Sequence, residues 1–323
     1  MQKVLKFGQT TRTSEEDEMI KRKETKIPDS VEIILSRGSQ YLAEEKYIDA
    51  LREFQIAHES NPRDPEVLFK IGLTYDYLTM FQQALNYYQR VLALAPDMEG
   101  AWEYSGVVYH KLQQYEKSVE CYNEAIKLNP AYPYAYYNKA LTLGSMGAFD
   151  EAIDCYDKTI SLEPRYGLAY TNKGIKLNTL GRYEAAVETL LLAVKYDKHN
   201  PKAYFALGKA SLALRRNLKA FRAFEKGLAL DPNDAEAWRN AGEAAFRAKR
   251  YDAATKAYQR SFELYPGAPG ITYCIADSLG HQNKYAEARV YIKKGLGRYP
   301  ASESLRALQQ ALQLEAFGRR SNR

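Results

Sequence analysis

Residues 99–132 read EGAWEYSGVVYHKLQQYEKSVECYNEAIKLNPAY, and this stretch decides the fold. Trp102, Gly106 and Tyr109 follow one another at spacings of four and three residues, which places them on one face of a helix. Small and aromatic residues have the same spacing in the second half of the stretch. Pro130 ends that half, because proline cannot continue a helix. The stretch therefore predicts two amphipathic helices joined by a tight turn.

The same unit recurs every 34 residues, with no insertion, from residue 31 to residue 302. The eight units cover residues 31–64, 65–98, 99–132, 133–166, 167–200, 201–234, 235–268 and 269–302. Position eight of each unit is small: Gly38, Gly72, Gly106, Ala140, Gly174, Gly208, Gly242 and Ala276. Position twenty is small as well: Ala50, Ala84, Ser118, Ala152, Ala186, Ala220, Ala254 and Ala288. Glycine within a helix costs about 1 kcal/mol relative to alanine, so its recurrence predicts close contact of the two helices, with positions eight and twenty facing each other.

Three further positions complete the pattern. Position four is bulky in seven units: Ile34, Leu68, Trp102, Tyr136, Tyr170, Tyr204 and Trp238. Position twenty-four is bulky in all: Phe54, Tyr88, Tyr122, Tyr156, Leu190, Phe224, Tyr258 and Ile292. Position thirty-two is proline in every unit except the fifth, which has Lys198. Residues 201–234 match least well, since Asn217 replaces the aromatic residue of the turn and Arg215 stands where several units have glycine or a small polar residue.

This order of small, aromatic and proline positions resembles the tetratricopeptide repeat (TPR) family, whose 34-residue unit is a helix–turn–helix. The resemblance covers nearly the whole chain. It implies an all-α fold, a right-handed α-solenoid superhelix of eight helix pairs in which each unit packs on its neighbours.

The two ends of the chain fall outside the repeats. Residues 1–30 mix acidic and basic residues with few apolar ones, which predicts a mobile charged arm. Residues 303–323 predict one further helix with Leu305, Leu308 and Leu312 on one face, followed by a basic tail. Because a solenoid leaves its last helix uncovered on one side, this helix is expected to act as a cap. It has too few apolar residues for us to expect membrane binding.

Composition and motifs point away from catalysis. The sequence contains no phosphate-binding glycine loop, no dinucleotide fingerprint and no metalloprotease or serine-hydrolase signature. Three cysteines show neither pairing nor metal-ligand spacing, and four histidines are scattered. We therefore expect no enzyme activity, no cofactor and no metal. Unpaired thiols and the lack of an apolar run long enough for a signal peptide or a membrane span favour the cytoplasm.

Charge is distributed unevenly along the repeats. Lys and Arg minus Asp and Glu give −8 for units one to four and +11 for units five to eight, within a net charge of +6. One interpretation is steering of an acidic partner toward the C-terminal half. Solvated faces and head-to-tail self-association are the alternatives.

The resemblance also implies where a partner would bind. In the family the concave surface is lined by first-helix positions two, five, six, nine, twelve and thirteen. Here these positions predict an apolar trough formed by Phe69, Leu73, Val107, Tyr134, Tyr137, Leu141 and Ile175, with Asn138 and Asn172 beside it. An asparagine amide can donate to and accept from a peptide group. The same surface becomes charged at Lys202, Lys209, Arg239 and Arg247, which predicts a basic end.

The apolar trough has an alternative. Strong curvature could instead bury the apolar position-nine residues against neighbouring first helices, so that no trough exists.

For function, the first hypothesis is a non-enzymatic adaptor that holds a peptide segment of a partner protein, acidic and partly apolar. The alternatives are nucleic-acid binding through the basic C-terminal half, which acidic residues such as Glu236 and Glu243 disfavour, and a regulatory subunit of an enzyme complex.

Overall fold

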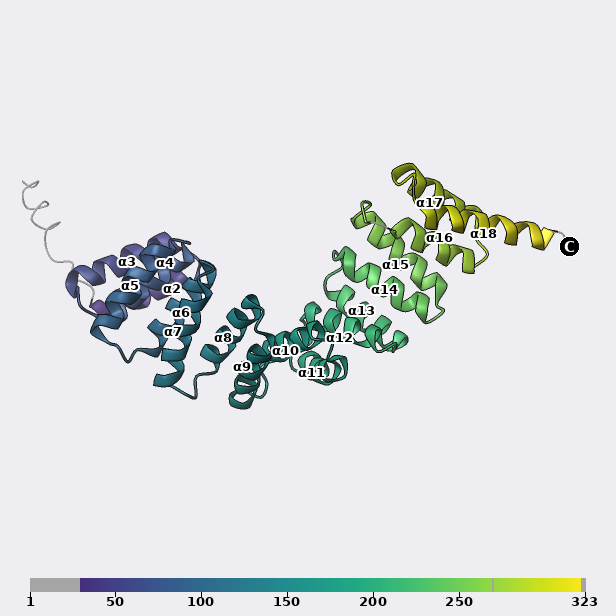
Figure 1. Ribbon diagram of the computed structural model, residues 1–323. Helices are drawn as coiled ribbons and strands as arrows, with labels where there is room; N and C mark the ends of the chain where they lie inside the picture. Colours follow the sequence, from purple (N-terminus) through teal and green to yellow (C-terminus); the bar gives the residue numbers. More distant parts are fainter. Residues whose placement is uncertain (1–29, 269, 321–323) are drawn as a thin grey trace, which may run out of the picture. The chain divides into compact units, whose positions relative to one another are not determined.

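The computed structural model describes residues 30–268 and 270–320, and within them it contains seventeen α-helices and no β-strand (Figure 1). Except for Ser30, the predicted arm of residues 1–30 lies outside the described residues, as do residues 321–323 of the predicted tail. The described residues up to Pro130 and those from Ala131 onward form two compact units.

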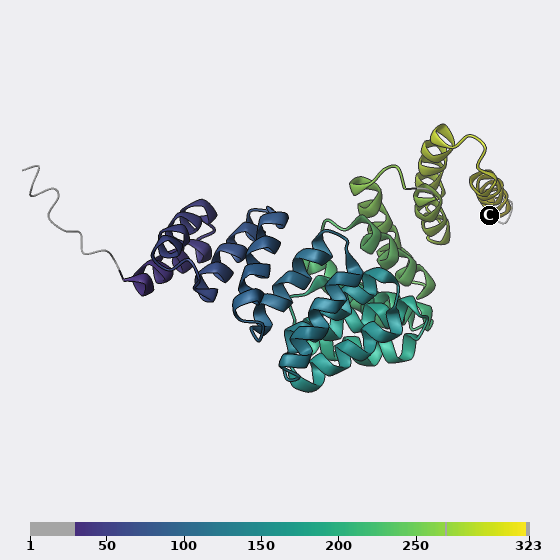
Figure 2. The same ribbon diagram turned by 60° about the vertical axis from the view of Figure 1, so that its left-hand side comes forward.

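The helix boundaries follow the 34-residue period. The first compact unit contains α2 (Val31–Ala43), α3 (Tyr47–Ser60), α4 (Pro65–Tyr77), α5 (Phe81–Leu94), α6 (Glu99–Lys111) and α7 (Tyr115–Leu128). The second contains α8 (Pro133–Met146), α9 (Phe149–Leu162), α10 (Gly167–Thr179), α11 (Tyr183–Tyr196), α12 (Pro201–Ala213), α13 (Asn217–Leu230), α14 (Ala235–Arg247), α15 (Tyr251–Leu264), α16 (Ile271–His281), α17 (Tyr285–Arg298) and α18 (Glu303–Arg320). Within each unit, consecutive helices pack as pairs and each second helix contacts the next first helix (Figures 1 and 2). The predicted all-α solenoid of helix pairs is confirmed.

The contact inside each pair explains the small residues, with one difference from the expectation. Ser118 at position twenty donates a hydrogen bond from Oγ to the Gly106 carbonyl over 2.8 Å, so positions eight and twenty are indeed neighbours. The missing side chain of Gly106, however, leaves room for the position-twenty-four ring: a Cβ there would lie 2.7 Å from Cε1 of Tyr122. Tyr122 is 1% exposed. Glycine at position eight therefore makes space for the large buried side chain at position twenty-four of the same repeat.

The turn between paired helices has one backbone conformation in all eight repeats. Position fifteen has positive φ whether or not it is glycine: Glu45, Thr79, Gln113, Gly147, Gly181, Arg215, Lys249 and Asn283. For a residue with a side chain this left-handed conformation costs roughly 1–2 kcal/mol. The sixth repeat, the weakest match in sequence, keeps the turn, with a φ of 57° at Arg215.

Proline closes every repeat except the fifth, and its carbonyl accepts hydrogen bonds from the next first helix. The Trp102 indole donates to the Pro96 carbonyl over 3.0 Å, and Trp238 donates to the Pro232 carbonyl over 2.9 Å. Arg306 of α18 makes the corresponding bond to the Pro300 carbonyl over 2.6 Å. The α18 helix thus docks as a first helix would.

The predicted cap covers the apolar side of the last helix pair. Leu305 and Leu312 are 3% and 5% exposed, and Leu308 packs against the same cluster. Two glycines make room for them: a Cβ at Gly295 would meet Leu305, and one at Gly280 would meet Leu312. One first helix begins at a different repeat position from the others. The α16 helix begins two residues later than the other first helices, directly after Gly270, which has a φ of 76°.

Two glycines of α6 allow a matched test of the helix–helix contact. We expect Gly106→Ala to lower the free energy of unfolding by about 1–3 kcal/mol, because the buried Tyr122 ring must move. Gly100→Ala should leave it unchanged or raise it by up to about 1 kcal/mol, because a Cβ there lies 3.8 Å from the nearest Phe69 atom and alanine favours the helix. Urea unfolding followed by circular dichroism measures both. Equal effects would contradict the proposed contact.

The cap can be tested in the same way. Leu305→Ala combined with Leu312→Ala should lower the free energy of unfolding by more than about 2 kcal/mol and increase aggregation on heating, because buried leucines cost roughly 2–5 kcal/mol each when truncated. The control pair Gln310→Ala and Gln313→Ala changes exposed residues of the same helix. Thermal melting with light scattering distinguishes the two. If both pairs behave alike, α18 does not stabilise the array.

Candidate protein-binding groove

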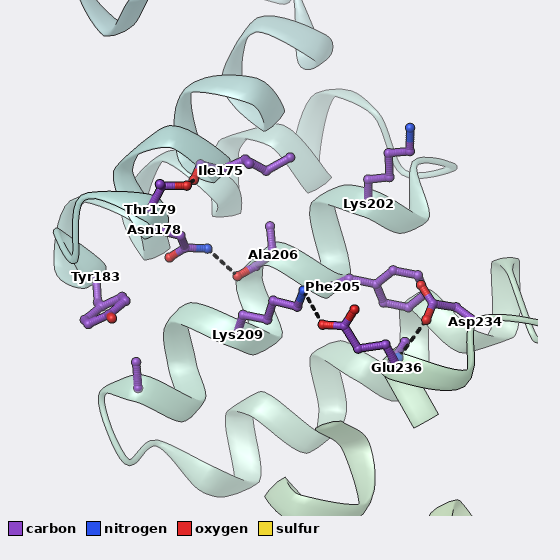
Figure 3. A pocket seen from close by; sticks show the side chains of 12 residues that line it. Ile175, Asn178, Thr179, Tyr183, Lys202, Phe205, Ala206, Lys209, Asp234 and Glu236 are labelled. Atoms are coloured by element: carbon purple, nitrogen blue, oxygen red, sulfur yellow. Dashed lines mark hydrogen bonds and ion pairs between the residues drawn. The ribbon is translucent and has the colours of Figure 1, made fainter. Parts of the chain in front are cut away.

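A cavity of about 550 Å³ opens on the first helices α10, α12 and α14 of the second unit (Figure 3). Its walls come from three successive repeats, and we call it the first-helix groove. Its lining residues are Ile175, Asn178, Thr179, Tyr183, Lys202, Phe205, Ala206, Lys209, Ala213, Asp234, Glu236 and Ala237.

The repeat register explains why these residues meet. Ile175, Asn178 and Thr179 are positions nine, twelve and thirteen of α10, and helical residues three and four apart share a face. Phe205, Ala206 and Lys209 supply positions five, six and nine of α12. Because successive first helices pack side by side, the same positions form one continuous surface.

The floor of the groove is apolar and its walls are polar. Phe205 and Ala206 are buried, and Ile175 is half-buried. The Asn178 amide donates from Nδ2 to the Ala206 carbonyl over 2.9 Å and thereby links α10 to α12 (Figure 3). Its Oδ1 atom is buried and has no hydrogen-bond partner among the described residues. A buried acceptor left in that state costs roughly 1–3 kcal/mol.

Charge in the groove is largely balanced. The Lys209 Nζ atom lies 2.9 Å from Oε1 of Glu236 on the next first helix (Figure 3). This hydrogen bond and the lysine charge hold the pKa of Glu236 below its usual value. Asp234 accepts from the Ala237 amide over 2.8 Å and caps α14. Lys202, by contrast, forms no ion pair with any described residue.

Two adjoining hollows extend this surface toward α16. The first, of about 400 Å³, shares Lys209, Ala213 and Glu236 with the first-helix groove and reaches Asn240. The second, of about 340 Å³, lies between α14 and α16. Here Arg247 pairs with Glu243 over 2.6 Å. Burial raises the pKa of Asp277, which lines this end together with Cys274.

Four of the residues predicted for the basic end lie on this surface, but half of them are neutralised. Lys202 and Lys209 line the first-helix groove, and Arg239 and Arg247 line its extension. Lys209 and Arg247 are held by glutamates, whereas Lys202 and Arg239 have no ion pair with a described residue. A count of charged residues along the sequence could not show this pairing, because the paired residues belong to different helical turns or to different repeats.

The predicted trough residues of the second unit lie on α8 and α10, and the structure shows that several are part of the packing. Tyr134 is 48% exposed. Tyr137 is half-buried, with its ring 5.0 Å from that of Tyr166, and burial raises its pKa. Asn172 donates from Nδ2 to the Tyr137 hydroxyl over 2.9 Å. One donor of the amide expected to hold a peptide therefore ties α10 to α8.

The remaining predicted residues are half-buried. Asn138, Leu141 and Ile175 belong to the second unit, and Leu141 packs beside the Tyr156 cluster. Ile175 alone of these three lines the first-helix groove. Position nine is therefore neither fully core nor freely exposed.

In the first unit, Phe69, Leu73 and Val107 are also half-buried, on α4 and α6. The Phe69 ring lies 5.4 Å from Tyr104 and 5.8 Å from Tyr88, so it contributes to the core. These residues lie in a different compact unit from the first-helix groove.

Sequence reasoning missed several lining residues. Asn178, Thr179 and Phe205 occupy positions twelve, thirteen and five, which the family comparison names as concave. The predicted trough follows the apolar residues of position nine, and the last of these is Ile175, so the prediction does not include these three residues. The signal that identifies them is the register itself.

Residues 30–268 and 270–320 contain no group of three or more His, Cys, Asp or Glu residues that could hold a metal ion. In the same residues, no helix has both the length and the apolar character needed to cross a bilayer.

Comparison with known proteins agrees with the geometry. A family model described as TPR repeat matches residues 106–147 and 176–214, and three described as tetratricopeptide repeat match residues 65–98, 133–166 and 205–269. No curated protein matches the sequence.

Solved structures share the fold at low identity. A tetratricopeptide repeat protein from Parabacteroides merdae is 16% identical, with a TM-score of 0.54 over 77% of this chain and 99% of that one. PilF from Pseudomonas aeruginosa is 21% identical, with a TM-score of 0.52 over 67% and 97%. YrrB, described as a TPR protein with an unusual peptide-binding site, is 18% identical, with a TM-score of 0.52 over 58% and 96%. With its period, its helix pairs and these family matches, the chain belongs to the tetratricopeptide repeat family.

Proposed function

We propose that this protein is a non-enzymatic scaffold that holds an extended segment of a partner protein in the first-helix groove. The observation that carries the proposal is the continuous surface across α10, α12 and α14, with an apolar floor and polar walls. Proteins usually bind their ligands at concave surfaces, and each protein has only a few of them.

The spacing of the helices suits an extended chain. Neighbouring packed helices lie about 8–10 Å apart, and an extended chain advances about 3.3 Å per residue. Every third residue of a bound segment would therefore meet the equivalent position of the next repeat. Ile175, Phe205 and Ala237 would contact its apolar side chains.

The charges of the groove favour a protein segment over nucleic acid. Asp234, Glu236 and Glu243 line the surface, and carboxylates repel phosphate. Lys209 and Arg247 are already held by two of these glutamates. Lys202 and Arg239 remain for an acidic residue of the partner, which fits an acidic and partly apolar segment.

The cysteines support placement in a reducing compartment, and we propose the cytoplasm. Cys121, Cys155 and Cys274 are free thiols. Burial raises the pKa of Cys121 to about 12 and also raises the pKa values of the other two. Protonated thiols do not act as nucleophiles, which agrees with a scaffold rather than an enzyme.

A bulky side chain in the groove should block binding. Ala213 is exposed and lines both the first-helix groove and the adjoining hollow. We expect Ala213→Trp to weaken binding at least about tenfold by occupying the groove, with an unchanged melting temperature. The partner is first captured from the native lysate and identified by mass spectrometry. Peptides spanning it are then titrated by fluorescence anisotropy.

The matched control is Ala229→Trp, an exposed alanine on the neighbouring helix α13 outside the groove. It should bind with the affinity of the unmodified protein. Equal binding by both variants, or equal loss in both, would show that the partner segment does not lie in the first-helix groove.

A further inference from the structure

The second helix of the fifth repeat differs from all the others on its outward face. Position twenty-five is polar or charged in seven repeats, and only the fifth has an apolar residue there: Gln55, Gln89, Asn123, Asp157, Leu191, Glu225, Gln259 and Lys293. Leu192 follows it. The two leucines of α11 are 53% and 37% exposed. A position that the fold keeps polar elsewhere is apolar here, so packing within the solenoid does not account for it.

Leu191 borders a hollow of about 310 Å³ between α11 and α13, which we call the second-helix groove. Its floor is formed by Val187 and Val194 of α11 and by Tyr204 and Leu207 of α12. It lies between two second helices, with α12 contributing to its floor, and it shares no lining residue with the first-helix groove.

One rim of the second-helix groove is a row of cations on α13. Arg216, Lys219, Arg222 and Lys226 all line it and are all exposed. None forms an ion pair with any residue in the described part of the chain, in contrast to Lys209 of the first-helix groove and Arg247 of the adjoining hollows. The acidic residues of α11 and α13 are absent from the lining. The row therefore presents four uncompensated positive charges beside an apolar floor.

We propose that the second-helix groove binds an acidic amphipathic helix of another protein, independently of the segment in the first-helix groove. The cationic row runs from Arg216, the N-cap residue of α13, to Lys226, ten residues further along, which is about 15 Å or roughly three helical turns. A helix laid along it can present carboxylates every three or four residues to the cations and apolar side chains to Leu191 and Val187. Charge complementarity and the exposed leucines together define this occupant.

Two other anionic partners fit less well. A phosphate backbone would pair with the cations but leave Leu191 and Leu192 unburied. A bilayer surface cannot enter a hollow whose floor lies between two helices. Both enter the test as competing outcomes.

The probe is a fluorescein-labelled helical peptide of about 14 residues, four turns, with glutamates along one side and leucines beside them. Two matched peptides replace the leucines with alanine or the glutamates with lysine. Anisotropy titration of the full chain near physiological salt should show binding of the glutamate–leucine peptide. Each matched peptide should bind at least about tenfold more weakly, since both the charges and the leucines contribute.

Charge-reversal variants locate the site. Arg222→Glu with Lys226→Glu should weaken the probe at least about tenfold. Lys256→Glu with Arg260→Glu makes the same change at the same repeat positions of α15, and should leave binding within about twofold. Leu191→Gln should also weaken the probe. Ala213→Trp, which blocks the first-helix groove, should have no effect on it. Unchanged melting temperatures show that each variant is folded.

Several results would overturn the proposal. These are no binding of the glutamate–leucine peptide at about 100 μM, equal loss in both charge-reversal variants, or equally tight binding of the alanine peptide. Binding of single-stranded RNA or of phosphatidylserine vesicles that is lost on Arg222→Glu with Lys226→Glu, without peptide binding, would assign the surface to those ligands instead.

Discussion

The close approach of two helices across one small residue, glycine in six of the eight repeats, is the constraint on which the whole array depends. At Gly106 the lack of a side chain admits the Tyr122 ring, and Ser118 bonds to the Gly106 carbonyl over 2.8 Å. The ring fills the interior of the pair, and the Trp102 indole then fixes the pair to the carbonyl that ends the preceding repeat. Because every repeat keeps a small residue at positions eight and twenty and a bulky one at position twenty-four, the outward positions of both helices are left free to differ. Function resides in those differences.

The two candidate surfaces use that freedom differently. Along the first-helix groove and its adjoining hollows, Lys209 and Arg247 are matched by glutamates on the next or the same first helix, so half of the cations are neutralised. On the second helices of repeats five and six, four cations of α13 have no such partners, and α11 exposes two leucines. Balanced charge suits recognition through shape and backbone hydrogen bonds. Unbalanced charge suits attraction of an acidic partner over a distance, which salt weakens.

The period in the sequence is enough to predict the helix pairs and the capping helix that follows them, because each repeat position has one structural role. It also predicted that Lys202, Lys209, Arg239 and Arg247 share a surface. It could not predict that Glu236 and Glu243 neutralise two of them, or that Asn172 bonds to Tyr137, since these depend on side-chain conformations across neighbouring helices. The late start of α16 depends on the left-handed conformation of Gly270, which the period does not encode.

The bonds that join successive repeats have a further consequence for how the protein moves. Asp76 to Lys111 and Tyr137 to Asn172 each link residues 35 apart, about one repeat length. Contacts of such short range in sequence make folding rapid and let one segment open while its neighbours stay closed. A ligand that bridges α10, α12 and α14 would slow amide hydrogen exchange in those repeats and leave exchange in α2 to α5 unchanged. Under tension the chain would yield one helix pair at a time, so a bound partner would act as a clamp on the few repeats it touches.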